Sequence, residues 1–176
     1  LVAVLGLAAC NNPDRYGAGG AGGAGGFGAG GAGGNGGAGT GFVDTNGLGD
    51  PSNPQSIAYF NQSVGDRVLF PVDQSSLTAE ARGVLAQQAQ WLQTNSDYAI
   101  IIEGHADEQG TREYNLALGA RRAASVQDFL ISNGVAPSRM RTISYGKERP
   151  IEICSDESCF SKNRRAVTVL SMGSGA

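Results

Sequence analysis

Apolar side chains between Ser56 and Leu170 recur in two patterns, short runs and helical spacings. The runs predict strands and the spacings predict helices, and the two kinds of element alternate along the chain. The predicted strands are 67–70, 98–103, 141–145 and 166–170, and the predicted helices are 78–94 and 112–133. The order β-α-β-α-β-β predicts an α/β sandwich in which two main helices pack on a four-stranded mixed sheet.

Local signals place the ends of several of these elements. Pro71 ends the first strand, since proline lacks an amide hydrogen. Thr78 is a favourable N-cap for the first helix, and Asn133-Gly134 is a stop signal for the second. The apolar run of residues 98–103, Tyr-Ala-Ile-Ile-Ile-Glu, predicts the central strand of the sheet.

The first ten residues read LVAVLGLAAC, an apolar run that is too short to span a bilayer. The run resembles the hydrophobic region of a secretory signal. Its ending, Leu-Ala-Ala-Cys, resembles the lipobox of bacterial lipoproteins, which implies that Cys10 is acylated and becomes the mature N-terminus. Asn11 follows in place of the Asp that favours inner-membrane retention, so we expect sorting to the outer membrane.

Residues 11–54 are rich in glycine and carry few apolar side chains beyond alanine. Such a segment cannot offset the entropy lost on ordering, so we predict a disordered tether at 11–54 and a folded domain at 55–172. A flexible coil of this length spans roughly 35–40 Å. The tether therefore suits a domain that must reach from a membrane to a nearby layer.

Charge and cysteine usage narrow the possible partners. A net charge of −3 and a pI near 5.1 argue against nucleic acid. With Cys10 assigned to lipid, Cys154 and Cys159 remain, and in an oxidising periplasm they would form a disulfide that closes a small loop. Half a metal site is the alternative, but it needs further ligands, and His105 is the single histidine of the sequence.

The most informative segment runs from Gly104 to Ala123 and reads GHADEQGTREYNLALGARRA. It leaves the predicted central strand, makes a polar turn and enters the second helix. The segment resembles the signature of the OmpA-like peptidoglycan-binding domain, and Val68-x-Phe70-x-x-Asp73 and Asn163-Arg164-Arg165 also match that family. The resemblance covers about residues 60–170. Together with the lipobox and the tether, it narrows to the peptidoglycan-associated lipoproteins, the Pal family.

This resemblance implies a non-enzymatic domain that needs no cofactor and holds the diaminopimelate residue of the peptidoglycan stem peptide. Matched by motif, Asp107 is implied to take the ligand's ammonium and Arg122 its carboxylate. Arginine suits a carboxylate because its planar fork can bond both oxygens. The alternative for this pair is a surface salt bridge within the turn and helix.

Four further residues are expected to support the site: Asp73, Asn115, Leu118 and Arg165. Asn115 would shape the site and Leu118 would pack beneath it. Asp73 lies either at the mouth of the site or in an ordinary turn, whereas Arg164 and Arg165 would brace the fold or rim the site. Pro71 stands where the family often has an acidic or small residue, so one amide that could hold ligand is missing.

The resemblance to the Pal family also implies a location and a role: a lipoprotein of the outer membrane that faces the periplasm and tethers this membrane to the cell wall. Its implied partners are peptidoglycan, TolB and other proteins of the Tol–Pal system, which supports envelope integrity and cell division. One rival is an OmpA-like lipoprotein outside the Tol system. Another is a periplasmic wall hydrolase using Glu103, His105 or Asp107, although His105 could equally bond within the turn.

Overall fold

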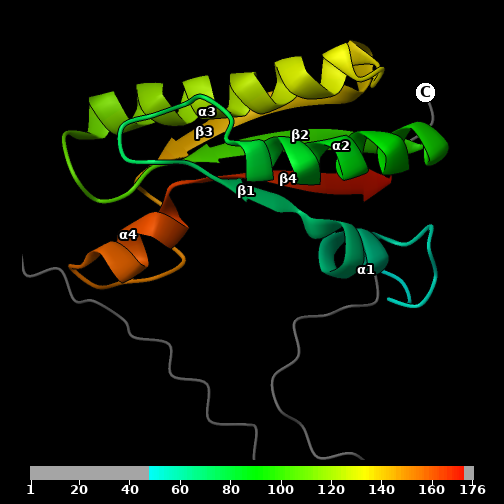
Figure 1. Cartoon of the computed structure of the whole chain (residues 1–176), viewed down its shortest axis with the longest axis horizontal. Helices are drawn as coiled ribbons and strands as arrows, with labels where there is room; N and C mark the ends of the chain where they lie inside the picture. Colours follow the sequence, from blue (N-terminus) through cyan, green and yellow to red (C-terminus); the bar gives the residue numbers. More distant parts are fainter. Residues whose placement is uncertain (1–47, 173–176) are drawn as a thin grey trace, which may run out of the picture. The chain divides into compact units, whose positions relative to one another are not determined.

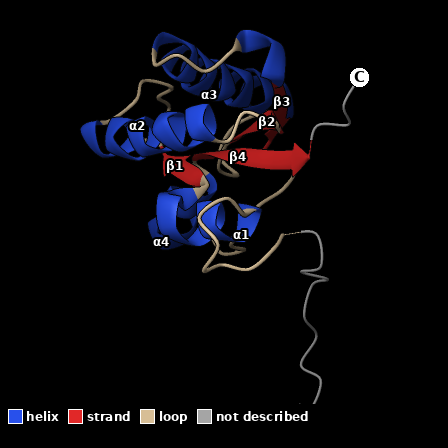
Figure 2. Ribbon diagram, turned by 90° about the vertical axis from the view of Figure 1, so that its right-hand side faces the viewer, coloured by secondary structure: helices blue, strands red, loops and turns tan. Residues whose placement is uncertain are grey.

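Residues 48–172 are the part of the chain that the computed structural model describes. Helices α2 (Ala79–Thr94) and α3 (Arg112–Ser132) lie on the same face of a four-stranded sheet (Figures 1 and 2). The strands are β1 (Arg67–Leu69), β2 (Tyr98–His105), β3 (Met140–Gly146) and β4 (Arg165–Met172). This arrangement confirms the predicted α/β fold, with two main helices on a mixed sheet.

The strands lie in the order β1-β4-β2-β3. Strand β4 runs antiparallel to both β1 and β2, whereas β2 and β3 are parallel and are connected through α3. Strand β2 is central, as its apolar sequence predicted, and its residues Ile100 and Ile102 are buried. Because β2 lies inside the sheet, its C-terminal end is held on both sides and can position the turn that follows it.

Threonine caps begin both long helices. The Oγ1 of Thr78 accepts a hydrogen bond from the amide of Ala81, at 3.1 Å, and Thr111 does the same for Tyr114, at 3.2 Å. Helix α3 ends at Ser132 and is followed by Gly134 with φ of 89°, a left-handed conformation that glycine adopts without steric cost. The predicted starts and ends of these helices therefore agree with the structure to within a residue or two.

Four short helical segments were not predicted. They are α1 (Ile57–Tyr59), the π-helix η2 (Phe60–Gly65), the 3₁₀ turn η3 (Pro137–Arg139) and α4 (Glu157–Asn163). Segments this short show little periodicity in the sequence, and tertiary contacts stabilise them. In α1 and η2, for example, Ile57 and Phe60 are buried in the core, where Phe60 packs 4.9 Å from Trp91 between ring centroids.

Ordered contacts begin several residues before the predicted start of the domain at residue 55. The carbonyl of Leu48 accepts a hydrogen bond from the amide of Ala58, at 2.8 Å, and the carbonyl of Pro54 accepts one from Nε1 of Trp91, at 2.7 Å. The predicted lipobox with Cys10, and the tether up to residue 47, lie outside the described residues. Within 48–172, no helix has both the length and the apolar character needed to cross a membrane.

Strand β2 and helix α3 approach each other closely at two glycines. A Cβ on Gly104 would overlap the carbonyl of Gly119, and one on Gly119 would meet the carbonyl oxygen of Gly104 at 2.8 Å. Only glycine allows two backbones to come this near. The contact fixes the first turns of α3 against the end of β2, where the candidate site lies.

Candidate ligand-binding site

A surface cavity of about 240 Å³ lies where the loop after β1, the turn after β2 and the first turns of α3 meet. These segments lie at the left of Figure 1, beside the arrowhead of β2. The cavity is lined by Val72, Asp73, Asp107, Gln109, Gly110, Tyr114, Asn115 and Leu118. The structure therefore brings together four residues that the sequence assigned to one site: Asp73, Asp107, Asn115 and Leu118.

Asp107 is a nearly buried carboxylate with a fixed orientation. Its Oδ1 accepts a hydrogen bond from the amide of Gln109, at 3.3 Å, and its Oδ2 forms an ion pair with Nη1 of Arg164, at 3.2 Å. The side chain is 9% exposed. A charge held so near the surface, with few waters around it, interacts strongly with a cation that enters the cavity.

Asp73 supplies a second carboxylate to the cavity, from the loop after β1. Its φ is 56°, the left-handed region that Asp tolerates better than most residues. The carboxylate accepts a hydrogen bond from the hydroxyl of Tyr114, which joins the loop after β1 to helix α3. Tyr114 also lines the cavity, but no feature of its sequence position distinguished it from an exposed helix residue.

Arg122 lies beneath the site and is completely buried. Its guanidinium donates to the carbonyls of Gln74 and His105, each at 2.8 Å, and to that of Pro71, at 3.2 Å. Burial lowers the pKa of Arg122 to about 10, with the charge of Arg164 acting in the same direction and Asp107 opposing it. Arg122 therefore ties the two loops of the site together.

The surface salt bridge between Asp107 and Arg122, weighed as an alternative, is wrong. Asp107 pairs instead with Arg164, whose guanidinium also donates to the carbonyl of Phe70, at 3.1 Å, and to the carboxylate of Glu157. The two carboxylates, first Glu157 and then Asp107, raise the pKa of Arg164. Sequence reasoning placed Arg164 at the rim or in the fold and missed Glu157 entirely.

The other expected residues have structural contacts. Asn115 is buried, and its amide donates to the carbonyl of Gln109, at 2.6 Å, which braces the turn after β2. Arg165 is buried but does not line the cavity; it donates to the carbonyls of Asn163, at 3.3 Å, and Arg149, at 3.1 Å. Pro71 lacks an amide, but its carbonyl accepts a hydrogen bond from Arg122.

The three residues of the hydrolase alternative do not converge on one cavity. Asp107 lines the cavity, whereas the ring of His105 is buried and stacks against Tyr145, with 5.5 Å between ring centroids. The Nε2 atom of His105 lies 3.5 Å from the carboxylate of Glu103. Burial, assisted by Arg165 and Arg149, lowers the pKa of His105 to about 3. A histidine that stays neutral and enclosed is poorly placed to exchange protons with a ligand.

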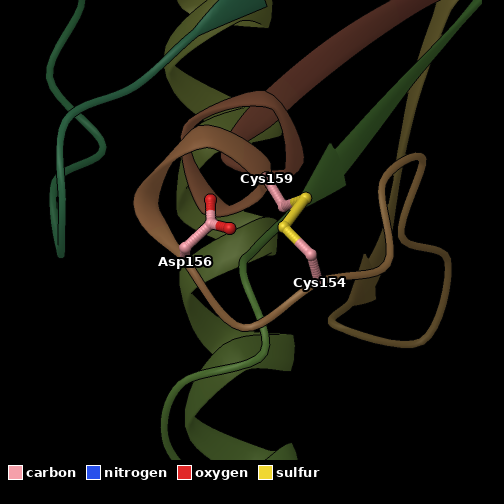
Figure 3. A group of neighbouring side chains, drawn as sticks. All are labelled: Cys154, Asp156 and Cys159. Atoms are coloured by element: carbon pink, nitrogen blue, oxygen red, sulfur yellow. A yellow bond between two sulfur atoms is a disulfide. The ribbon is translucent and has the colours of Figure 1, made fainter.

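The predicted disulfide between Cys154 and Cys159 is present (Figure 3). Asp156 lies within the closed loop and caps α4, since its carboxylate accepts a hydrogen bond from the amide of Ser158, at 2.8 Å. The two sulfurs and this carboxylate lie within 4.8 Å of one another, as a metal site would require. However, the two sulfurs are bonded to each other and are not the thiolates that a metal binds. The disulfide therefore argues against a metal site at these cysteines.

The sheet order, the two helices and the acidic cavity at the end of β2 define an OmpA-like domain. A profile described as the OmpA family matches residues 69–164. The crystal structure of the peptidoglycan-associated lipoprotein from Burkholderia pseudomallei has a TM-score of 0.62 and 38% identity, covering 70% of this chain and 98% of that chain. The C-terminal domain of Helicobacter pylori MotB, at a TM-score of 0.58 and 23% identity, shares the fold alone.

Sequence relatives give a narrower assignment. A peptidoglycan-associated lipoprotein of Mesorhizobium japonicum is 60% identical over 131 residues, which cover 74% of this chain and 77% of that protein. Another, from Pseudomonas aeruginosa, is 41% identical over 128 residues, 73% of this chain and 70% of that protein. The chain therefore belongs to the OmpA family and, within it, groups with the peptidoglycan-associated lipoproteins, as the signature segment, the lipobox and the tether together predicted.

Proposed function

We propose that the chain binds peptidoglycan non-covalently through the cavity that Asp73 and Asp107 line. The observation that carries this proposal is the placement of two carboxylates around one small cavity, with Arg122 and Arg164 behind them. Membership of the OmpA family and the names of the relatives support the same ligand. Binding, not catalysis, is the role that these contacts suit.

The ligand that fits this charge arrangement carries an ammonium group beside a carboxylate, as diaminopimelate does. The ammonium would lie between Asp107 and Asp73, since charge-assisted hydrogen bonds are the strongest that a small polar ligand can make. The ligand's carboxylate would lie toward the side of the cavity nearest Arg122. Because the guanidinium already bonds three carbonyls, we assign Arg122 two tasks: holding the loops and supplying a positive field for the carboxylate.

We further propose that this binding tethers the outer membrane to the cell wall within the Tol–Pal system. In this scheme Cys10 carries the lipid, the Gly-rich segment crosses part of the periplasm, and TolB is a protein partner. The family supports the scheme, and the lipobox at residues 7–10 is consistent with it. A family member outside the Tol system would share the cavity but fail to bind TolB.

The decisive experiment is a pull-down of the 176-residue chain with purified sacculi that contain diaminopimelate. Asp107→Asn removes the charge but keeps the shape of the side chain. It should weaken binding roughly 10- to 150-fold, the change in affinity expected when one hydrogen bond to a charged group is lost. Asp128→Asn is the control, because Asp128 is an exposed carboxylate of helix α3 that does not line the cavity. Equal binding by Asp107→Asn and wild type would refute the cavity as the site.

Two additional measurements separate the rivals. A pull-down with purified TolB that fails while sacculus binding succeeds would place the chain outside the Tol system. Release of soluble muropeptides from sacculi by the wild-type chain would favour the wall hydrolase, and its loss in Asp107→Asn would assign the activity to this cavity.

A further inference from the structure

Arg164 lies between two carboxylates that belong to different parts of the domain. Its Nη1 contacts Oδ2 of Asp107 and Oε2 of Glu157, each at 3.2 Å, and its Nη2 donates to the other oxygen of Glu157. The side chain of Arg164 is 5% exposed and its Nε donates to the carbonyl of Phe70. One positive charge is therefore shared by two negative charges, and the group of three is negative overall.

The position of Glu157 is set by a small crosslinked loop. Glu157 is the first residue of α4. It follows the N-cap residue Asp156 and comes two residues before Cys159, which forms the disulfide with Cys154. Figure 3 shows the disulfide and Asp156 together around this first turn of α4. The bond joins Cys159, which is buried, to Cys154, five residues earlier in the sequence. The loop holds the start of α4 in place and, with it, the Glu157 carboxylate beside Arg164.

We propose that Glu157 is a positioning residue for the ligand site, acting through Arg164 on Asp107, and that the Cys154–Cys159 loop sets its position. This inference rests on the proposed function. Because Glu157 offsets part of the positive charge of Arg164, that charge neutralises Asp107 only in part. Asp107 therefore still attracts an ammonium group. Without Glu157, the whole guanidinium charge faces Asp107 and competes with the ligand cation.

The side chain of Glu157 is 64% exposed, so solvent screens its influence and the effect is modest. Glu157→Gln keeps the size and one oxygen acceptor but removes the charge. We expect it to weaken sacculus binding by the full chain about two- to fivefold. The ratio of variant to wild-type dissociation constants should shrink as ionic strength rises, because salt screens exposed charges. A purely structural role would not produce this salt dependence.

Glu152→Gln is the matched control. Glu152 lies two residues before the Cys154–Cys159 loop and forms an exposed ion pair with Lys162, at 3.1 Å, but its side chain does not contact Arg164 or Asp107. We expect it to bind as wild type does. The double variant Cys154→Ser/Cys159→Ser should weaken binding by the same range as Glu157→Gln, and adding Glu157→Gln to it should cause no further loss. Thermal unfolding of each variant checks that it is folded.

The inference is overturned if Glu157→Gln binds as tightly as wild type, if its loss does not depend on salt, or if the losses of the cysteine and Glu157 variants multiply. In each of these cases wild-type binding to sacculi leaves the proposed function intact. Failure of the wild-type chain to bind sacculi would refute both.

Discussion

The two ends of the domain use the same device to hold their loops. At the end of β2 that carries the cavity, Arg122 donates to three backbone carbonyls. At the opposite end, Arg139 also donates to three: those of Leu92 and Asn95, each at 2.9 Å, and that of Tyr98, at 3.0 Å. In both places one guanidinium donates to backbone carbonyls in loops and at the ends of helices and strands.

What differs between the ends is the charge in front of the arginine. Each end has a cavity of about 240 Å³. The one near Arg139 is lined by a single carboxylate, the exposed Asp97, whereas the one above Arg122 has Asp73 and the buried, ion-paired Asp107. Cavity volume and a bracing arginine are therefore common to both ends. The pair of fixed charges is what distinguishes the cavity that we propose as the binding site.

The largest expected effect comes from removing the buried brace. Arg122→Met keeps most of the side-chain volume but removes the guanidinium bonds to the carbonyls of Gln74 and His105, and one of the two donors to that of Pro71. We expect the free energy of unfolding, measured by urea denaturation, to fall by about 3–5 kcal/mol. Arg121→Met is the control, since Arg121 is exposed, and should change it by less than about 0.5 kcal/mol. If the two variants were equally stable, Arg122 would not brace the loops.

The second-largest expected effect is a dependence of stability on pH, caused by His105 at the end of β2 that carries the cavity. In residues 48–172 neither ring nitrogen of the buried His105 has a hydrogen-bond partner. Its pKa is about 3 in the folded protein and 6.5 in its ordinary state, so below pH 6.5 the unfolded chain binds a proton that the folded chain does not. Stability should therefore fall as pH falls from about 6.5 to 3, by about 2 kcal/mol between pH 7 and pH 5.

His105→Phe keeps a ring against Tyr145 and removes the titrating group. Urea unfolding at several pH values should show a shallower decrease for this variant than for wild type, whatever its absolute stability. Parallel curves for the two proteins would mean that His105 has the same pKa in the folded and unfolded states.

Features that depend on residues close together in the sequence were predicted, whereas features that depend on contacts between distant residues were not. Helices α2 and α3 were placed well because their apolar spacing, threonine caps and the Gly134 stop lie within the elements themselves. Segments α1 and α4 carry too few residues for a periodic signal. The packing of Ile57 in α1, beside Phe60 in η2, is a property of the folded chain. The disulfide at Cys159 was predicted, but a disulfide does not by itself indicate that a helix such as α4 contains one of its cysteines.

For the site, motif matching selected Asp107 and Asp73, and the structure places both on one cavity. It could not give the burial of Arg122, whose carbonyl partner Pro71 lies 51 residues away, nor the pairing of Asp107 with Arg164, 57 residues away. Such contacts depend on how loops meet in space. A motif that assigns a charged residue to ligand cannot reveal that its hydrogen bonds are already used within the protein.

The smallest expected effect comes from Arg139→Met, and it sharpens the contrast between the ends. Arg139 is half-buried. In the variant, water can therefore replace some of the hydrogen bonds that the guanidinium donates to the carbonyls of Leu92, Asn95 and Tyr98. We expect a loss of about 1–2 kcal/mol in the free energy of unfolding, less than for Arg122→Met. Sacculus binding by the folded variant should equal that of wild type, because Arg139 lies at the end of β2 away from Asp107. Weakened binding by a stably folded Arg139→Met would show that the two ends are coupled, and that loop bracing at one end contributes to ligand affinity at the other.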